Sequence, residues 1–424
     1  MANWIRELKF MAQQPYSLTA LALLLVLSSA SLALGYAEVK RQEDSIARMQ
    51  VMDQVERASI AETLSDYGSA AYYNFYPTWN APSELAFTAL GQRDVAPYML
   101  RVRALAIEGQ IYETDSLNPE LGLSGRFDYE FVVAFLVPLF VVFLLHDMIA
   151  TERESGRLPQ LIAAAGSAGR LWVPRAGLRI VSVMLMALLP FWVLSAIGSV
   201  GPSSILTISL IVAGQIAVWS LLTLWLARSE RSSSAIAAML VTVWLGLSLL
   251  VPLLSKAAID RAVPSVEGAD ISLVQREAVN DAWDLPKSAT MEPFYAAYPD
   301  LADSPPITEP FHWKWYYAFQ HVGDLTASEL SDAYRESIKA RDRASGFVAL
   351  VSPAVAVQRA MQRAAGTDVV RALEYEQQVR DYHARIREFY YPYLFRDKPY
   401  DPAVVAQVPE FDVTDTGGKV DENT

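Results

Sequence analysis

Five long apolar segments constrain this chain more than any other feature of its sequence. A helix needs about 20 apolar residues to cross a hydrocarbon core of about 30 Å, because each residue adds about 1.5 Å. Only 19% of the residues are charged, against about 25% in soluble domains. We therefore predict an α-helical membrane protein with about five transmembrane helices. The predicted spans are Tyr16–Tyr36, Tyr129–Ala150, Leu178–Val200, Ser204–Ala227 and Ser234–Leu254.

The first apolar segment follows Arg6 and Lys9, as the apolar core of a secretory signal peptide would. It is longer than such a core and runs directly into a charged segment, so we interpret it as an anchored helix. Three other spans contain an interior proline. Kinks are expected there, with neighbouring helices satisfying the freed carbonyls. These prolines are Pro138, Pro190 and Pro252.

The distribution of basic residues predicts the orientation, because Lys and Arg concentrate in cytoplasmic loops. Arg6 and Lys9 share one side of the membrane with two basic loops. We therefore expect a multi-pass protein of the bacterial inner membrane with a cytoplasmic N-terminus. The loop residues are Arg153, Arg157, Arg170, Arg175, Arg179, Arg228 and Arg231.

This orientation divides the chain into membrane, cytoplasmic and extracytoplasmic parts. Two extracytoplasmic regions are expected to be mainly helical, residues 37–128 and the larger domain 255–424. The remaining parts are the N-terminal segment with the first span, 1–36, the second span, 129–150, a cytoplasmic loop, 151–177, and spans three to five, 178–254.

In the first outer region, apolar residues recur at helical spacing from Ile46 to Leu64, which predicts that the first span continues as a stalk helix. Val51, Met52 and Val55 belong to this apolar series. Four later prolines break the region into short pieces. An aromatic cluster there is interpreted as core packing or an interfacial belt. Its members are Tyr72, Tyr73, Phe75, Tyr76 and Trp79.

Three helices are predicted in the second outer region. Thr326 and Glu329 fit a capping box that opens a helix ending near Arg343. Ser352 and Pro353 fit the N-cap and first position of another helix. The third helix is expected from Asp368 to Phe389, with its charges on a solvated face. The aromatic run 311–319 is interpreted as domain core or membrane contact.

Several functional classes are disfavoured by composition and motifs. The net charge of -12 argues against a nucleic-acid partner. The absence of cysteine excludes disulfides and thiolate chemistry. The pair Gly418–Lys419 is followed by Val420 and is no P-loop. The four histidines lack zinc-site spacing. We expect no metal, no resident cofactor and no enzyme active site.

The ionisable residues that remain have structural interpretations. His312, His321 and Asp324 are interpreted as surface side chains, and His146 with Asp147 as capping and snorkelling groups at a helix end. Acidic and basic residues are absent near the centre of every predicted span. An ion-coupled carrier normally needs such a group, so the energy is expected to come from another source.

The segment directly after the second span carries the main functional signal. Leu158, Leu161 and Ile162 recur at helical spacing behind a charged stretch, which predicts a short amphipathic helix at the cytoplasmic surface. Gly156 permits a sharp turn between the span and this helix. Such a helix can dock into a groove on a soluble partner.

This segment resembles the type-2 ABC exporter permease family, whose members carry an E-R-E-x-G-x-L-x-x-L pattern after the second span. Matching positions are Glu152, Arg153, Glu154, Gly156, Leu158 and Leu161. Four further stretches look like the subclass with large extracytoplasmic insertions. They are GRFDYEF at 125–131, ARSERSSSAIAAML at 227–240, VSPAVAVQRAMQRAAGTD at 351–368 and YDPAVVAQVPEF at 400–411.

The resemblance implies a permease subunit without its own nucleotide site. Its coupling helix would contact a separate ATPase that uses ATP and Mg, and it would export a substrate while paired with a second copy or a similar permease. Such permeases usually have a sixth span after the segment matched here by 409–411. We expect that span to be absent or truncated, with the C-terminus outside.

Two alternatives remain open. The first is an ATPase-driven membrane complex that acts mechanically on an envelope partner through its outer domains, without transport. About 260 of the 424 residues are predicted to lie outside by span length, which favours this alternative. The second is a sensor or receptor that has no ATPase.

Overall fold

The computed structural model of the protein describes residues 2–112 and 127–412. Five of its helices are long and apolar enough to cross a membrane, which confirms the prediction of an α-helical, multi-pass architecture. One of the four prolines predicted to break the first outer region, Pro119, and the pair Gly418–Lys419 lie outside the described residues. The five helices are Pro15–Ala61, Tyr129–Glu154, Ala168–Ile197, Pro202–Ala227 and Ser233–Ala262.

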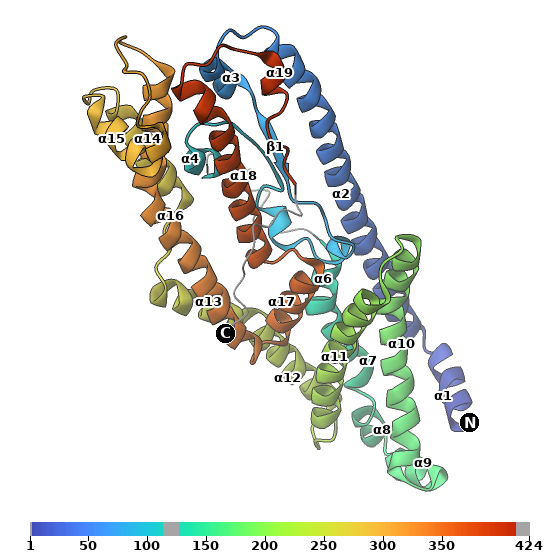
Figure 1. The fold of residues 1–424 in the computed structure, drawn as a ribbon. Helices are drawn as coiled ribbons and strands as arrows, with labels where there is room; N and C mark the ends of the chain where they lie inside the picture. The colour runs from blue at the N-terminus through green and yellow to red at the C-terminus, as the bar shows by residue number, and fades with distance from the viewer. Residues whose placement is uncertain (1, 113–126, 413–424) are drawn as a thin grey trace.

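The membrane helices pack as a bundle at one end of an elongated molecule (Figure 1). α2 packs on α10, and α7 packs on α11. Val133, Val212 and Trp219 are buried between them. The continuous elements are α1 (Ala2–Ala12), α2 (Pro15–Ala61), α10 (Ala168–Ile197) and α11 (Pro202–Ala227). The second span comprises α6 (Tyr129–Phe131), η3 (Val132–Leu136), α7 (Val137–Leu145) and α8 (Ala150–Glu154), and the fifth comprises α12 (Ser233–Leu245), η4 (Gly246–Leu250) and α13 (Val251–Ala262).

The second and fifth spans each contain one π-helical turn just before a proline. An α-helix would pair the N–H of residue 138 with the Ala134 carbonyl, but Pro138 has no N–H to donate. Gln215 on α11 donates to that carbonyl instead, at 3.1 Å, and Trp244 on α12 donates to the Phe135 carbonyl at 3.1 Å. Neighbouring helices therefore satisfy the freed carbonyls, as predicted. Pro190 lies within the continuous helix α10.

The stalk prediction is confirmed, because α2 runs unbroken for 47 residues, about 70 Å at 1.5 Å per residue. The apolar residues that indicated the stalk do not all pack. Val51, Met52 and Val55 are more than 60% exposed. The stalk instead buries Gln42 against Arg93 and buries Asp53 beside Arg57. The covered face is thus the one that meets Arg93 on η2 (Gly91–Asp94) and Arg101 on β2 (Met99–Val102).

The remainder of residues 62–112 forms short elements around a two-stranded antiparallel sheet that the sequence analysis did not predict. β1 pairs with β2, with Tyr76 opposite Val102. Both of these side chains are fully buried. The elements are α3 (Tyr67–Tyr73), β1 (Tyr76–Trp79), η1 (Ala86–Thr88), η2 (Gly91–Asp94), β2 (Met99–Val102) and α4 (Ile107–Tyr112).

The two large regions outside the spans share one hydrophobic core, and we call residues 37–112 and 263–412 together the head. Its second part is helical. The elements are α14 (Gly268–Asp281), α15 (Ser288–Ala297), η5 (Pro299–Leu301), α16 (Trp313–Ala349), α17 (Pro353–Ala365), α18 (Val369–Phe395) and α19 (Pro402–Val405).

Two of the three predicted helix starts in the head are confirmed. Ser352 caps α17 by accepting from the Val355 N–H at 3.3 Å, and Asp368 caps α18. The capping box at Thr326 is wrong, because α16 already begins at Trp313, and the Thr326 hydroxyl donates to the Val322 carbonyl. The helix therefore begins within the aromatic run 311–319, earlier than Thr326 and Glu329 suggested.

That aromatic run belongs to the head core. Tyr317 and Phe319 are fully buried, as are Tyr390 and Tyr391 on α18. Phe294 and Phe395 stack with ring centroids 4.5 Å apart. In the first region, Tyr76 also enters this core. Core packing is therefore the correct interpretation for residues 313–319, whereas Phe311 is 42% exposed.

The solvated-face interpretation of α18 is wrong for two of its charged residues. Arg380 Nε donates to Glu108 Oε1 at 2.8 Å, and Arg387 Nη2 lies 2.9 Å from Asp324 Oδ2. Both arginines are largely buried. The surface interpretation of His321 and Asp324 is wrong for the same reason, since both pack in this interior beside Arg387. These two arginines recur at helical spacing along α18, but acidic residues on other elements pair with them.

The Gln215 hydrogen bond gives a stability prediction. Gln215→Ala should lower the free energy of unfolding by about 1–2 kcal/mol, because the Ala134 carbonyl loses its donor in apolar surroundings. In a Pro138→Ala background a backbone N–H returns, so the loss should be less than half as large. Unfolding in mixed micelles measures both. Gln160→Ala, at an exposed position, is the control, and equal losses in both backgrounds would contradict the assignment.

His321 predicts a pH dependence. Burial, assisted by the nearby Arg387 charge, lowers the pKa of His321 to about 4 from its ordinary value of 6.5. As pH falls from about 6.5 to 4, the unfolded chain takes up this proton before the folded chain does, so stability is lost. His321→Gln should therefore gain stability relative to the parent as pH falls through this window. Thermal unfolding at each pH measures the difference, with His146→Gln as the control. A difference independent of pH would disprove it.

Candidate functional site

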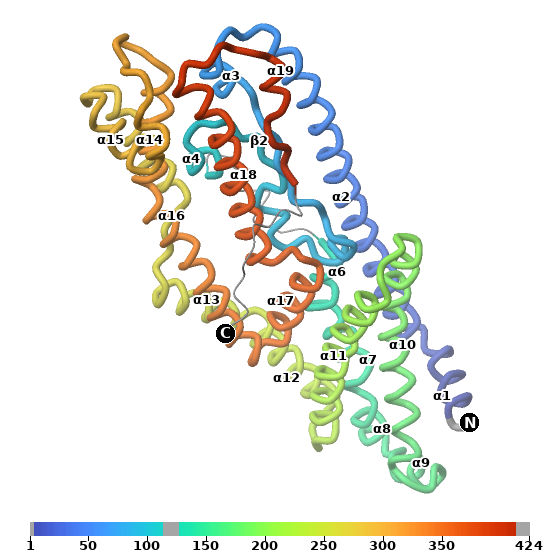
Figure 2. Tube along the Cα trace, viewed as in Figure 1, coloured from blue at the N-terminus to red at the C-terminus, as the bar shows by residue number. Residues whose placement is uncertain are grey.

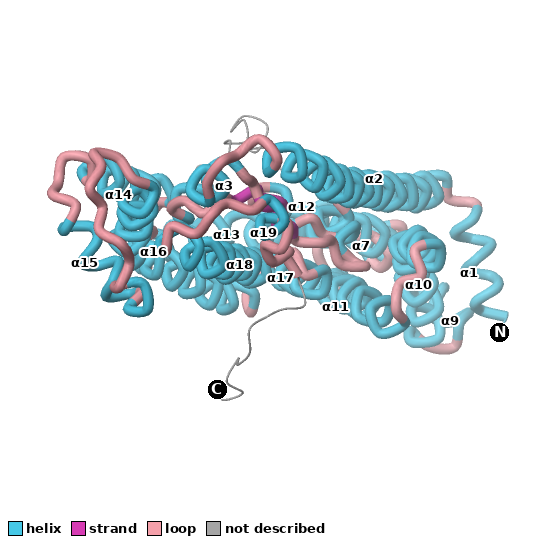
Figure 3. Tube along the Cα trace, turned by 45° about the horizontal axis from the view of Figure 1, so that its top comes forward, coloured by secondary structure: helices cyan, strands magenta, loops and turns pink. Residues whose placement is uncertain are grey.

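The predicted surface helix exists and follows a sharp turn. α9 (Leu158–Ala165) is joined to α8 by a turn in which Gly156 adopts a φ of +70°. This left-handed conformation suits glycine, which has no Cβ to clash. We call residues 150–165 the elbow. It lies at the end of the molecule opposite α14 and α15 (Figures 2 and 3).

The entry to the elbow is capped as expected. His146 Nδ1 lies 3.0 Å from the Val142 carbonyl oxygen at the end of α7. Asp147 Oδ1 lies 3.7 Å from Arg179 Nη1 on α10. Arg179 also donates to the Leu144 carbonyl. These contacts satisfy polar groups at the helix end, which supports the capping interpretation.

Arg153 joins the elbow to the loop before the fifth span, and Glu154 joins it to the start of that span. Arg153 donates to the Ser229 carbonyl at 2.6 Å and to the Arg231 carbonyl. Glu154 Oε1 accepts from the Ser233 N–H at 2.7 Å. Ser233 opens α12, where a helix leaves N–H groups free and favours negative charge. A displacement of α8 would therefore pull on the start of the fifth span.

Glu152 joins the elbow to α1 and α10. Arg175 on α10 lies 3.3 Å from Glu152 Oε1 and donates from Nε to Glu7 Oε2 at 3.0 Å. Arg157 lies 3.1 Å from the second Glu152 oxygen. Glu7 and Arg175 are nearly buried. Neither partner was predicted from the sequence, because Glu7 and Arg175 each lie in a helix with other charged residues and no motif marks them as a pair.

The apolar residues of α9 have a different role. No residue of α9 is buried, and Leu158 and Leu161 are half-buried. Leu161 lines a pocket of about 360 Å³ between α1, the elbow and α10. The six predicted site residues thus share one elbow. Its charged members anchor it to three helices, while α9 presents a largely uncovered surface.

A second junction, which was not predicted from the sequence, connects the head to the spans. One face of α17 packs on the membrane helices α11 and η3. Its buried residues are Ala354, Val357, Met361 and Ala365. Gln362 Nε2 donates to the two Glu130 oxygens at 2.9 and 3.2 Å. Directly after α17, Thr367 donates to the Ala89 carbonyl at 2.9 Å. Both parts of the head therefore meet the second span here.

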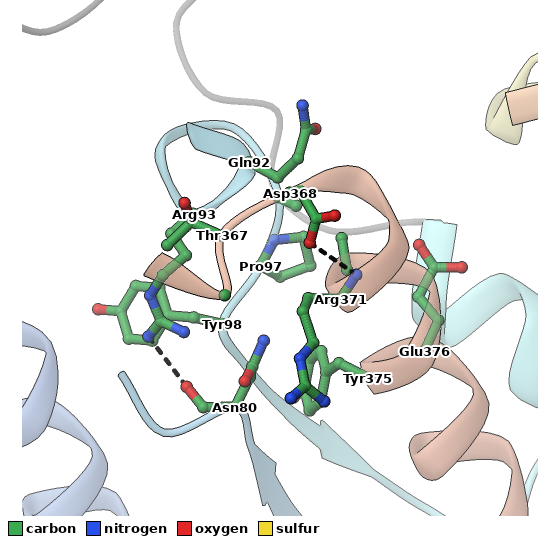
Figure 4. Close-up of a pocket in the computed structure, with 13 residues that line it drawn as sticks. Asn80, Gln92, Arg93, Pro97, Tyr98, Thr367, Asp368, Arg371, Tyr375 and Glu376 are labelled. Atoms are coloured by element: carbon green, nitrogen blue, oxygen red, sulfur yellow. Dashed lines mark hydrogen bonds between the residues drawn. The ribbon is translucent and has the colours of Figure 1, made fainter. Parts of the chain in front are cut away.

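A pocket in the head lies between η2 and the start of α18 (Figure 4). Arg93 donates to the Asn80 carbonyl at 2.9 Å and to Gln42 at 2.9 Å. Burial lowers the pKa of Arg93 to about 10, so it stays charged at neutral pH. The open volume is about 20 Å³, enough for about one water molecule. This pocket is part of the packing between η2 and the start of α18, and it is too small for a substrate.

Comparisons with known proteins give one match. A family described as a domain of unknown function (DUF3526) matches residues 270–414, which cover most of the second part of the head. No curated protein and no solved structure matches the chain. Among the described residues, no group of three or more His, Asp or Glu side chains is arranged to hold a metal ion.

The buried charge at the elbow gives a prediction. Arg175→Met should lower the free energy of unfolding by about 3 kcal/mol, because two poorly solvated carboxylates lose their partner. Arg6→Met is the matched control, since the Arg6 side chain is 55% exposed and its contact with Glu7 is 3.5 Å. That change should cost less than about 1 kcal/mol. Similar losses for both variants, in thermal unfolding, would show that Arg175 is not a buried partner.

Proposed function

We propose that this protein is the membrane-spanning permease subunit of an ABC transporter, and that a separate ATPase drives export of its substrate. The elbow carries the proposal. It combines an uncovered surface helix with charged anchors on α1, α10 and α12. We place the elbow and the N-terminus in the cytoplasm, as the basic loops favour.

In this proposal the ATPase binds α9 and displaces it during nucleotide turnover. Glu152, Arg153 and Glu154 pass that displacement to α1, to the third span and to the start of the fifth span through the contacts described above. The second permease subunit lies against a mainly apolar groove of about 780 Å³ between α2, α7 and α12. Membrane lipid covers the remaining exposed apolar surface of the spans.

One observation favours the mechanical alternative, in which the complex acts on an envelope partner without transport. α2 is a single helix that packs on α10 in the membrane bundle and continues into the head, where it contacts β1. A rigid helix of this length can carry a displacement from the spans to the head. Stimulation of the ATPase by a transported compound in reconstituted vesicles would favour export over this alternative.

The docking surface can be tested without disturbing the anchors. Ala163 is exposed on α9 and forms no part of the charged network. Ala163→Arg should therefore abolish co-purification of the ATPase, because a long charged side chain would block a close-packed groove. The same protein should keep its parental unfolding temperature. Quantitative pull-down in mild detergent gives both the ATPase yield and the folded fraction.

Ser203→Arg is the matched control, because Ser203 is also exposed but lies at the opposite end of the spans, beside Pro202 at the start of α11. It should leave the ATPase yield unchanged. If Ala163→Arg and Ser203→Arg both retain the parental yield, α9 is not the docking surface. Detection of no ATPase with the parental protein would instead favour a sensor or receptor.

A further inference from the structure

α16 and α17 form a helical hairpin whose base is charged and whose tip is apolar. Arg359 on α17 donates to both carboxylate oxygens of Asp342 on α16, at 2.5 and 3.0 Å. Residues 344–358 between these helices contain no ionisable side chain. We call residues 342–359 the head hairpin. The ion pair between Asp342 and Arg359, which we call the clasp, holds α16 and α17 together at the base of the hairpin. The tip extends beyond the clasp.

The tip exposes large apolar side chains to an unusual degree. Phe347 is 74% exposed, Leu350 is 83% exposed and Val351 is 57% exposed. Contiguous apolar exposure of this kind marks a contact with another apolar phase or with a partner. These side chains contribute little to the head core, so their apolar character requires a separate explanation.

The head hairpin runs beside the fifth span, from the end of α13 at its base to η4 at its tip. Arg341, just before the base, donates to the Val263 carbonyl at 3.0 Å, after the end of α13. At the tip, the Ser352 hydroxyl donates to the Leu247 carbonyl at 2.7 Å. Leu247 precedes Lys256, the first charged residue of α13, by about 13 Å along the helix. The tip therefore lies at the level of the apolar part of the fifth span, and Figure 1 shows the turn between α16 and α17 near α12.

The contact between the Ser352 hydroxyl and the Leu247 carbonyl is explained by Pro252. In the π-helical register of η4, where Val251 donates to Gly246, residue 252 would donate to Leu247, and Pro252 has no N–H. A carbonyl left open in hydrocarbon is costly, and non-helical backbone is tolerated there only against protein. The hairpin tip supplies the missing donor, while its own turn packs on η4.

We propose that the head hairpin is a re-entrant membrane segment, with Phe347, Leu350 and Val351 in contact with lipid acyl chains in the leaflet nearest the head. Lipid is the occupant that fits, because α17 packs on η4 of the fifth span, and this span exposes large apolar side chains of its own. Leu249, Leu250, Leu253 and Leu254 are each about half exposed or more. The charged clasp at Asp342 and Arg359 then lies toward the headgroups. This inference does not depend on the ATPase.

The absence of cysteine from the chain permits a direct test in the full-length protein. Single variants Leu350→Cys and Phe347→Cys would carry a nitroxide spin label after reconstitution into phosphatidylcholine vesicles. Collision rates are measured with oxygen, which concentrates in hydrocarbon, and with a water-soluble nickel complex present on both sides. The ratio of oxygen to nickel collisions should be about tenfold higher at the tip than in water.

Lys339→Cys is the matched control, because Lys339 is exposed on the same helix, before the base of the hairpin. Its label should collide mainly with nickel. Tip labels that collide with nickel as often as the Lys339 label would place the tip in water and overturn the proposal. Low collision rates with both reagents would also overturn it, in favour of cover by protein such as a second copy. Two tip positions guard against a variant that fails to fold.

Discussion

The fold depends on satisfying backbone carbonyls inside apolar surroundings. Pro138 and Pro252 each interrupt a span, and each interruption is answered by a side chain from another element. Gln215 comes from a neighbouring span, whereas Ser352 comes from the head. Because hydrocarbon offers no water to replace a lost donor, these contacts fix how the spans pack and how closely the head approaches them. A kink in one helix thus specifies the position of a distant segment.

The head and the spans are also joined by packing and by side-chain contacts. α17 packs its apolar face on the bundle, and Gln362 donates to the buried Glu130 carboxylate at the start of the second span. At the other end, Glu152, Arg153 and Glu154 tie the elbow to three helices. Polar contacts therefore hold the bundle at both ends, to α17 at one end and to the elbow at the other. A displacement at either junction has a continuous path of packed helices and ion pairs to the other.

The candidate site was predictable in part, for a local reason. Gly156 and the spacing of Leu158 and Leu161 specify a turn and a short amphipathic helix within a few residues. The partners of the charged residues were not predictable. Glu7 and Arg175 are far apart in sequence, and Ser233 contributes a backbone N–H that no sequence motif marks. Similarly, the charges of α18 resembled a solvated face until Glu108 and Asp324 were found opposite them.

The sequence by itself determined the five spans, the stalk and the helix starts at Ser352 and Asp368, because hydropathy, helical period and capping act over short distances. Only the tertiary structure decided that the stalk buries Asp53 and leaves Val51 exposed, that residues 313–319 start a helix in the head core, and that β1 pairs with β2. It also decided that the α16–α17 hairpin descends beside the fifth span. These outcomes depend on which distant group satisfies a buried charge or an open carbonyl, and local patterns do not encode that choice.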